Sequence, residues 1–288
     1  MNRARDLIRL ARPHHWIKSG FVFVGLLFGH AWHDLDLVLR VTATAAGFSL
    51  VASATYALND FLDRERDRAH PIKRTRPLAA GTVSPAAALG LAGLLVPIGL
   101  LMGLWGSPTN CVIILLYATL NVAYSLWLKH VVILDVFAIA AGFMLRLLAG
   151  TVGVGIAPSK WLLLCGLMVT LFLGFTKRRA EHASGSPHSA RAVLDLYSAD
   201  LLDTMLSVTA AGTIITYGLY TMSPETIATH GTGNLIYTVP FVIYGVFRFM
   251  YLVRWDRGED TSRDVFRDPH LLAVALAWIA LTWLLIAA

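Results

Sequence analysis

The sequence predicts an all-α integral membrane protein with about nine transmembrane helices. The chain has 288 residues, of which 56% are hydrophobic and only 15% are charged, and its mean hydropathy is +0.62. A soluble domain usually carries about a quarter charged residues. Apolar runs of about 17 to 22 residues, long enough to cross a bilayer, recur along the whole chain.

Nine apolar segments make up this prediction. They cover residues 16–32, 38–58, 86–105, 110–127, 131–151, 160–176, 202–222, 236–253 and 270–287. The first follows a basic stretch but has no small-residue cleavage site behind it, so we expect a retained transmembrane helix rather than a removable signal. Because little hydrophilic sequence remains between the spans, residues 1–288 are expected to form a single polytopic membrane domain.

The distribution of Lys and Arg predicts the orientation of these spans. Alternate connections, beginning with the N-terminal tail, hold nearly all the basic residues, whereas those near 33–37, 106–109, 152–159 and 223–235 hold none. Since cytoplasmic loops are enriched in Lys and Arg, the N-terminus is predicted to be cytoplasmic. We therefore expect catalytic loops at the cytoplasmic face, at about residues 59–85, 128–135 and 177–201.

Composition and motifs exclude several other functions. The net charge of +6 would suit nucleic acid, but the basic residues sit between apolar runs, so we expect no nucleic-acid partner. Cys111 and Cys165 lie inside apolar runs, which leaves no disulfide framework and no zinc-binding spacing. The sequence also lacks a Rossmann or P-loop fingerprint.

The most informative segment, residues 59–77, follows the second predicted span. If that helix continues beyond the membrane, Asn59, Asp63, Asp67 and His70 recur at i, i+4, i+8 and i+11, within an arc of about 80°. Oxygen donors on one stripe suit Mg²⁺, which binds carboxylates together with substrate phosphates. Dense charge at a membrane boundary is costly, so we favour a metal site over a solvated loop that only sets topology.

Cationic side chains beyond this stripe suit the phosphates themselves. Lys73 and Arg76 follow in the same loop, and Lys129 follows the fourth span, close to Tyr124. Lys129 and Tyr124 are equally well explained as anchors at the membrane interface. In the same way, Lys18 at the first span is either part of a basic aromatic belt or a ligand of a lipid phosphate.

Two ionisable residues lie inside one apolar segment. Asp135 and Arg146 share a helix face to within about 20° but are about 16 Å apart along the axis, so they cannot pair with each other. Each needs a partner from another helix, a ligand or water, and an ionisable residue in a membrane is a functional candidate.

A last charged group, Lys177, Arg178 and Glu181, ends the sixth predicted span. Lys177 and Glu181 are four residues apart, so they also suit a simple ion pair at a helix end.

The spacing of Asn59, Asp60, Asp63 and Asp67 resembles the first motif of the UbiA superfamily of intramembrane prenyltransferases, N-D-x-x-D-x-x-x-D. Nine spans and a cytoplasmic N-terminus are also typical of that superfamily. Within it the chain is most similar to a branch that transfers phosphoribose to a polyprenyl phosphate. The residues that carry this resemblance are Arg12-Pro13, Trp16, Lys18, His70-Pro71, Lys73, Arg76-Pro77, Tyr124-Ser125, Leu128-Lys129, Asp135, Arg146, Lys177-Arg178 and Glu181.

Two positions depart from the superfamily. Ordinary prenyltransferases carry a second motif, D-x-x-x-D, whereas here Asp135 is followed four residues later by Ile139, which argues against an aromatic prenyltransferase. The phosphoribosyl branch usually has Asn after the lysine near the first span, and this chain has Ser19.

The resemblance implies a donor, an acceptor and a metal. The donor would be 5-phosphoribosyl 1-pyrophosphate (PRPP), the acceptor a polyprenyl (decaprenyl) phosphate, and the cofactor Mg²⁺. The implied metal ligands are Asn59, Asp60, Asp63 and Asp67, and the implied catalytic residues are Asp63, Asp67 and Asp135. The implied PRPP-binding residues are His70, Lys73, Arg76, Tyr124, Lys129, Lys177, Arg178 and Glu181. Lys18 and Arg146 would bind the acceptor phosphate.

The same resemblance implies a multi-pass protein of the bacterial plasma membrane that makes a precursor of cell-wall arabinan, and a homo-oligomer is compatible with it. Two alternatives remain open. One is a prenyltransferase with a polyprenyl diphosphate donor and an aromatic acceptor. The other is a transporter or lipid carrier, although transporters place polar sites near the midplane rather than at one face.

Overall fold

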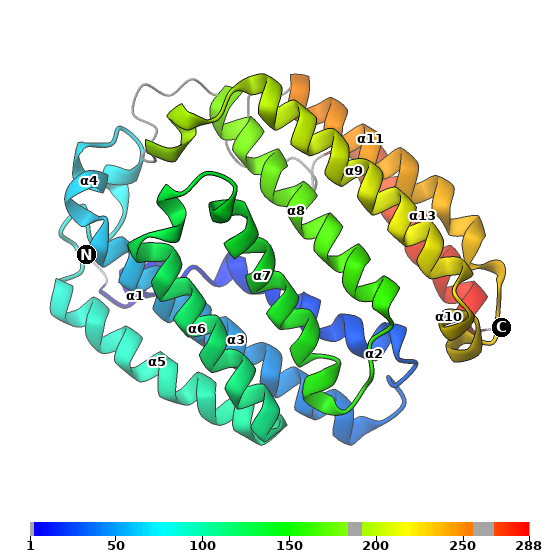
Figure 1. Cartoon of the computed structure of the whole chain (residues 1–288). Coiled ribbons are helices and arrows are strands. Elements are labelled where there is room, and N and C mark those ends of the chain that lie inside the picture. Colours follow the sequence, from blue (N-terminus) through cyan, green and yellow to red (C-terminus); the bar gives the residue numbers. More distant parts are fainter. Residues whose placement is uncertain (1–2, 184–191, 256–267, 288) are drawn as a thin grey trace. The chain divides into compact units, whose positions relative to one another are not determined.

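The computed structural model describes residues 3–183, 192–255 and 268–287, and all the regular elements in these ranges are helices. The chain forms two compact units, Met1–Pro158 and Ser159–Ala288. Figure 1 shows their helices coloured along the sequence. The prediction of an all-α protein is therefore confirmed for the described part of the chain.

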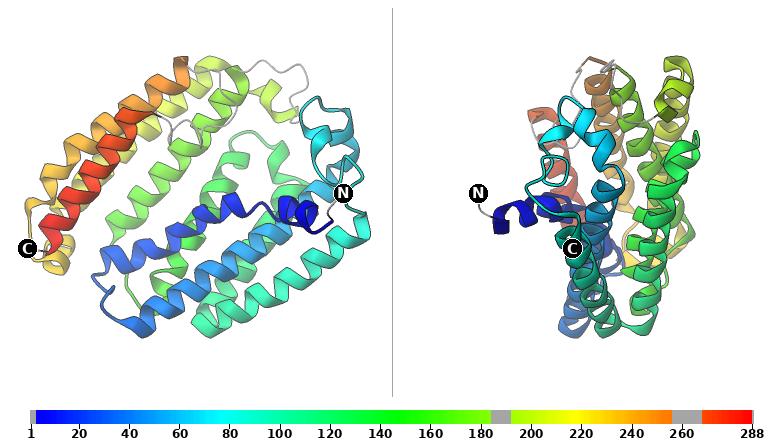
Figure 2. Two further views of the ribbon diagram at one scale, coloured as in Figure 1. Left: turned by 180° about the vertical axis from the view of Figure 1, so that it is seen from behind. Right: turned by 90° about the vertical axis from the view of Figure 1, so that its left-hand side faces the viewer.

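The first unit contains four long helices, α3 (Leu35–Leu62), α5 (Pro85–Gly106), α6 (Pro108–Leu126) and α7 (Leu134–Ala149). α3 packs along α5, and α6 packs against α3, α5 and α7. The shorter elements are α1 (Arg3–Ala11), η1 (Pro13–Phe23), α2 (Val24–Phe28), α4 (Arg64–Ala69), η2 (Lys73–Thr75), η3 (Leu128–His130) and η4 (Val152–Val154). In Figure 2 the N-terminal segment lies along α3.

Serine–proline pairs start two of these helices. Ser84 and Ser107 are N-cap residues whose hydroxyl oxygens accept hydrogen bonds from the backbone N–H groups of Ala87 (3.2 Å) and Asn110 (2.9 Å). The proline that follows each serine occupies the start of the helix, where its missing N–H removes no helical bond. These caps fix the beginnings of α5 and α6.

The segment expected as the first transmembrane helix differs from the prediction. Residues 16–32 are not one α-helix, because they fall in η1, a 3-10 helix of 11 residues, and in α2, which has 5 residues. Here the backbone meets the end of α7. A Cβ atom on Gly25 would lie 1.7 Å from the carbonyl oxygen of Gly150, and one on Gly150 would lie 1.7 Å from that of Val22. Only glycine permits this approach, which hydropathy does not reveal.

Two apolar clusters hold the first unit together. One gathers buried side chains of α3, α6 and η1, including Phe48, Ile114 and Val22. The other joins Leu10 of α1 to Leu78 and Val83, which lie between η2 and α5. The basic loop after α4 is therefore anchored in a core, and this fixes the position of the residues just before Leu78.

The second unit contains α8 (Lys160–Ala183), α9 (Ala199–Met222), α11 (Val239–Trp255) and α13 (Pro269–Ala287). α8 packs on α9, and α11 packs on α8, α9 and α13, so these helices run side by side (Figure 1). The short elements are η5 (Ala192–Leu196), α10 (Pro224–His230) and η6 (Asn234–Thr238). Tyr217 joins three of the elements, since its hydroxyl lies 2.6 Å from that of Thr238 and accepts a hydrogen bond from Trp278 Nε1 (2.8 Å).

Seven of the nine predicted spans coincide with helices that are long and apolar enough to cross a membrane. Such a set identifies a multi-pass membrane protein. The predicted span 202–222 lies in α9, a continuous helix of 24 residues in which threonine recurs among the apolar residues. The count of nine stays a prediction for this helix and for residues 16–32, and the cytoplasmic N-terminus also stays a prediction.

Candidate active site

The acidic segment leaves α3 without losing the helical hydrogen-bond pattern. α3 ends at Leu62, Asp63 follows with φ −90° and ψ 2°, and α4 begins at the next residue. The backbone N–H of Asp63 donates to the Asn59 carbonyl (2.9 Å), and that of Asp67 donates to the Asp63 carbonyl (2.8 Å). These bonds between residues four apart keep Asn59, Asp63 and Asp67 on one face.

His70 does not continue this stripe, which corrects its expected place. α4 ends at Ala69, and His70 has extended backbone angles, φ −87° and ψ 132°. Its ring is buried, and Nδ1 accepts hydrogen bonds from the backbone N–H groups of Ile72 (3.2 Å) and Lys73 (3.3 Å). Nδ1 is then the acceptor nitrogen of a neutral imidazole, and the ring shapes the turn that carries Lys73.

Asp60 lies behind the stripe and is bound by two arginines. Arg12 Nη2 lies 2.7 and 2.8 Å from the two Asp60 carboxylate oxygens. Arg76 Nη1 lies 3.1 Å from Asp60 Oδ1 and 2.7 Å from Asp67 Oδ2. Asp60 and Asp67 are both 2% exposed, so this network is a buried one in which two cations balance two carboxylates. In this arrangement Asp60, expected as a metal ligand, orients Arg12 and Arg76.

The environment of Asp67 changes its acidity. Burial raises the pKa of the Asp67 carboxyl above its ordinary value, the nearby Arg76 opposes that rise, and Asp60 adds to it. Desolvation disfavours a charged carboxylate, and a cation favours it, so the two effects have opposite signs here. A further cation beside Asp67 would therefore stabilise its charged form.

Lys129, which lies far along the chain in η3, binds Asp63 of the stripe. Its Nζ lies 2.9 and 3.0 Å from the two oxygens of Asp63, a residue 66 positions away, and its side chain is 8% exposed. Between η3 and α7, Ile133 has φ 69°, a costly conformation for a β-branched residue. Asp135 follows two residues later in the first turn of α7 and is fully buried. The strained turn therefore separates Lys129 from Asp135.

Arg146 occupies a different place in the first unit, in the last turn of α7. Its side chain is buried, Nη2 donates to the Tyr117 hydroxyl (2.8 Å) and Nη1 to the Gly142 carbonyl (2.8 Å). The guanidinium lies 4.5 Å from the centre of the Tyr117 ring and 5.5 Å from that of Phe48. Aromatic faces are its partners, and α7 separates it from Asp135 by about 16 Å.

Lys18 and Tyr124 are both half-buried and border the same unit. Lys18 lies on η1 between two contacts with α3, since Trp16 Nε1 donates to Ser53 Oγ (2.9 Å) and Ser49 Oγ donates to Ser19 Oγ (2.9 Å). Ser19, which stands where the resemblance would place Asn, is therefore part of the seam that holds η1 on α3. Tyr124 is in the last turn of α6, just before Lys129.

The remaining predicted residues lie in the second unit, at the end of α8. Arg178 is fully buried and pairs through Nη1 with Glu181, three residues later. Lys177 is exposed, and the next cation, Arg179, donates from Nε to Asp203 Oδ1 of α9 (2.7 Å). These residues form a charged cluster that joins the end of α8 to the start of α9.

The side chains of the stripe offer oxygen ligands, the type that Mg²⁺ prefers. Among the described residues, no three His, Cys, Asp or Glu side chains converge closely enough to hold a metal by themselves. Mg²⁺ is usually bound by one or two carboxylates plus water and substrate phosphates rather than by an all-protein cage. The amide of Asn59 and the carboxylates of Asp63 and Asp67, all on one face, provide such a partial set.

The chain as a whole is similar to a known family of membrane enzymes. The model of the UbiA prenyltransferase family matches residues 19–268, so the chain belongs to that family, and the resemblance seen in the motif residues is confirmed. A UbiA homolog from Archaeoglobus fulgidus, solved bound to GPP and Mg²⁺, matches with a TM-score of 0.71 over 98% of this chain and 100% of its own. At 16% identity, this likeness concerns the fold alone.

Sequence relatives narrow the class further. The decaprenyl-phosphate phosphoribosyltransferase of Mycolicibacterium smegmatis is 31% identical over 96% of this chain and 91% of its own length. That of Corynebacterium glutamicum is also 31% identical, over 96% of this chain and 86% of its own length. The family and these relatives identify the chain as a transferase.

Sequence reasoning missed the role of Arg12. It interpreted the basic segment at the first span as an aromatic belt or as a ligand of a lipid phosphate, whereas Arg12 binds Asp60, a residue 48 positions away. The one local signal in the sequence is that Arg12 directly precedes a proline, Pro13, which restricts its backbone. In the structure Arg12 has φ 51°. A non-glycine residue with positive φ at a helix junction commonly marks a functional constraint.

Proposed function

We propose that this chain transfers 5-phosphoribose from PRPP to a polyprenyl phosphate, decaprenyl phosphate in the first instance, and releases pyrophosphate. The observation that carries the proposal is near-full-length similarity to decaprenyl-phosphate phosphoribosyltransferases, at 31% identity. The charge of the first unit supports it. Arg76 and Lys129 bind Asp67 and Asp63 of the acidic stripe, and Arg12 binds the neighbouring Asp60. Such cations suit a donor whose 5-phosphate and diphosphate carry several negative charges.

The proposal assigns the stripe to Mg²⁺, with Asn59, Asp63 and Asp67 as the residues that would hold it. Bound there, the ion would neutralise charge that develops on the departing diphosphate. Asp60 keeps Arg12 and Arg76 in place. Asp135, buried at the start of α7, is assigned to the catalytic centre with Asp63 and Asp67.

Other residues would bind the two substrates. Lys129 and Arg76 lie on carboxylates of the stripe, so both guanidinium and ammonium groups are positioned for phosphate oxygens of a donor bound beside them. The resemblance further assigns donor binding to His70, Lys73, Tyr124, Lys177, Arg178 and Glu181. It assigns the acceptor phosphate to Lys18 and Arg146.

The chemistry needs little acid–base assistance from the chain. The acceptor phosphate is already an anion, and one of its oxygens attacks C1 of the ribose while the bond from C1 to the diphosphate oxygen breaks. The bonding electrons leave with pyrophosphate, and no proton has to move. Catalysis is then mainly positioning of the two substrates and electrostatic stabilisation of the leaving group.

The finer topology belongs to the same proposal. We infer one polytopic domain with nine spans, a cytoplasmic N-terminus, a bacterial plasma-membrane location and an active site at the cytoplasmic face, as the Lys and Arg distribution predicts. PRPP is soluble and would enter from that side. The lipid product would serve as a precursor of cell-wall arabinan.

Transfer of radiolabelled ribose phosphate from PRPP into organic-extractable lipid tests this function. Purified protein, Mg²⁺ and decaprenyl phosphate are the only other components. We expect labelling that requires Mg²⁺ and falls by at least about a hundredfold in Asp63→Asn, because the stripe loses the charge that the metal needs. Arg66→Gln, an exposed change on α4, is the matched control and should label normally.

The outcome also separates the alternatives. Labelled product from a polyprenyl diphosphate and an aromatic acceptor, with none from PRPP, would replace the proposal with ordinary prenyl transfer. Lipid or ion movement across vesicles without product formation would support a carrier instead.

A further inference from the structure

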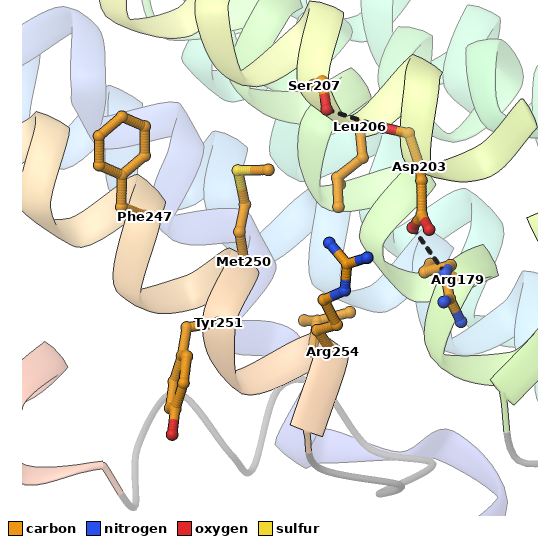
Figure 3. Close-up of a pocket in the computed structure, with 9 residues that line it drawn as sticks. Arg179, Asp203, Leu206, Ser207, Phe247, Met250, Tyr251 and Arg254 are labelled. Atoms are coloured by element: carbon orange, nitrogen blue, oxygen red, sulfur yellow. Dashed lines mark hydrogen bonds and ion pairs between the residues drawn. The ribbon is translucent and has the colours of Figure 1, made fainter. Parts of the chain in front are cut away.

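A cavity of about 300 Å³ lies within the second unit, between α8, α9 and α11 (Figure 3). None of the residues assigned above to metal, donor or acceptor lines it. Its apolar part is formed by Leu206 and Val253, which are buried, together with Met250. Next to them Phe247 of α11 is 59% exposed and continues the apolar surface outward. The apolar lining of the cavity is therefore continuous with the exposed apolar surface of α11.

The charged side chains of the cavity lie near the ends of three long helices. Arg179 is in the last turns of α8, Asp203 is in the first turns of α9, and Arg254 ends the apolar segment Asn234–Arg254. All three side chains line the cavity, and Figure 3 shows Arg254 extending from α11 toward α9. An apolar floor beneath a charged rim at the end of membrane helices is the environment of a lipid headgroup.

The charge of the rim selects the ligand. Arg179 Nε donates to Asp203 Oδ1 at 2.7 Å, so these two charges balance each other. Arg254 forms no ion pair with any residue in the described ranges, so the described residues that line the cavity carry one net positive formal charge. A phosphodiester carries one negative charge, whereas a phosphomonoester carries about −1.5 to −2 at neutral pH and would be only partly neutralised.

We propose that this cavity binds the phosphodiester headgroup of an anionic glycerophospholipid, with Arg254 on the phosphate and the acyl chains along the exposed apolar face of α11. Basic pockets between membrane helices are known to recognise anionic headgroups. A zwitterionic choline lipid fits less well, because its quaternary ammonium would be brought close to the positive charge of Arg254. This site is separate from the proposed transfer reaction and does not depend on it.

Native mass spectrometry of the full-length protein in detergent tests the proposal. The probes are phosphatidylglycerol and phosphatidylcholine with identical acyl chains, added at equal concentration. We expect about fivefold greater retention of phosphatidylglycerol, the preference that one basic residue gives for a lipid of net negative charge over a zwitterionic one. Arg254→Gln should abolish the preference, whereas Arg66→Gln, which removes an exposed arginine of the first unit, should keep it.

A second variant separates cavity binding from general charge. Met250→Trp fills the cavity and leaves both arginines in place, so it should lower phosphatidylglycerol retention while the protein keeps its melting temperature. The proposal is overturned if the unaltered protein retains both lipids equally or if Arg254→Gln keeps the preference. It is also overturned if millimolar inorganic phosphate displaces the lipid, or if decaprenyl phosphate binds more tightly with the same dependence on Arg254.

Discussion

At the scale of single residues, the carboxylates at the end of α3 form ion pairs with cations from distant parts of the chain. Arg12 binds Asp60 across 48 positions, and Lys129 binds Asp63 across 66. Arg76 contacts both Asp60 and Asp67, so removal of one carboxylate changes the balance of charge around the others. Such buried pairs contribute less through attraction than through the cost of leaving either partner uncompensated.

Asp60→Asn should therefore destabilise the protein strongly. Arg12 and Arg76 would lose a carboxylate that is 2% exposed, and we expect a loss of about 3 kcal/mol in the free energy of unfolding, measured by SDS-induced unfolding in detergent. Asp36→Asn on the same helix is the control. Its pair with Arg40 is exposed, with side chains 72% and 48% accessible, so the loss should stay below about 0.5 kcal/mol. Equal losses would contradict the buried network.

The stripe and its partners differ in how far sequence could predict them. Asn59, Asp63 and Asp67 follow from helical spacing, because that spacing is a local property of the backbone. His70 lay beyond the helix end, where no period applies. Contacts such as Lys129 with Asp63 depend on how α3 meets η3, and a single sequence holds no direct record of that packing.

At the scale of elements, the contact of η1 and α2 with the end of α7 fixes the N-terminal segment. Gly150→Ala would place a methyl group 1.7 Å from the Val22 carbonyl oxygen, a clash that only backbone movement relieves. We expect a loss of about 1–3 kcal/mol, seen as a lower melting temperature in detergent. Gly218→Ala in α9 is the control, since a Cβ there meets nothing within 4 Å. It should be neutral or stabilise by up to about 1 kcal/mol.

The start of α13 provides a test that depends on pH. Arg248 Nη2 binds Asp268 Oδ2 at 2.7 Å, and this hydrogen bond holds the pKa of the Asp268 carboxyl below its ordinary value of 3.8. A depressed pKa stabilises the folded protein above the unfolded value, and the contribution disappears as the pH falls through the folded value.

Asp268→Asn should keep the N-cap acceptor for the Leu271 N–H but remove the charge. We expect a lower melting temperature than that of the unaltered protein at pH 7, with the difference closing as the pH falls below about 4. Arg248→Gln should behave in the same way. A difference that persists unchanged at pH 3 would show that the ion pair with Arg248 is not its cause.

At the scale of the whole molecule, hydropathy correctly predicted the helices whose own sequence is uniformly apolar. α5 and α13 match their predicted spans closely because each consists of one apolar run with a clear start. Residues 16–32 are apolar too, yet their path follows the Gly25–Gly150 contact rather than an α-helical repeat. In α9 the hydropathy is lowered by threonines, several of which bond to backbone carbonyls of their own helix, as Thr213 does to Thr209.

Those two segments decide the topology of everything that follows them. The Lys and Arg distribution predicts that both cross. For residues 16–32, the N-terminal tail and the loop after α3 are basic and the connection near 33–37 is not. For α9, the segments 177–201 and 248–269 are basic and the connection near 223–235 is not. Single cysteines, introduced after Cys111 and Cys165 are changed to Ser, can report this with a membrane-impermeant maleimide. We expect Asp36→Cys and Glu225→Cys to react in intact cells, and Arg9→Cys and Leu196→Cys only after permeabilisation. All four positions are exposed in the structure. Protection of Asp36→Cys would mean that residues 16–32 do not span, and reaction of Leu196→Cys and Glu225→Cys from the same side would mean that α9 does not.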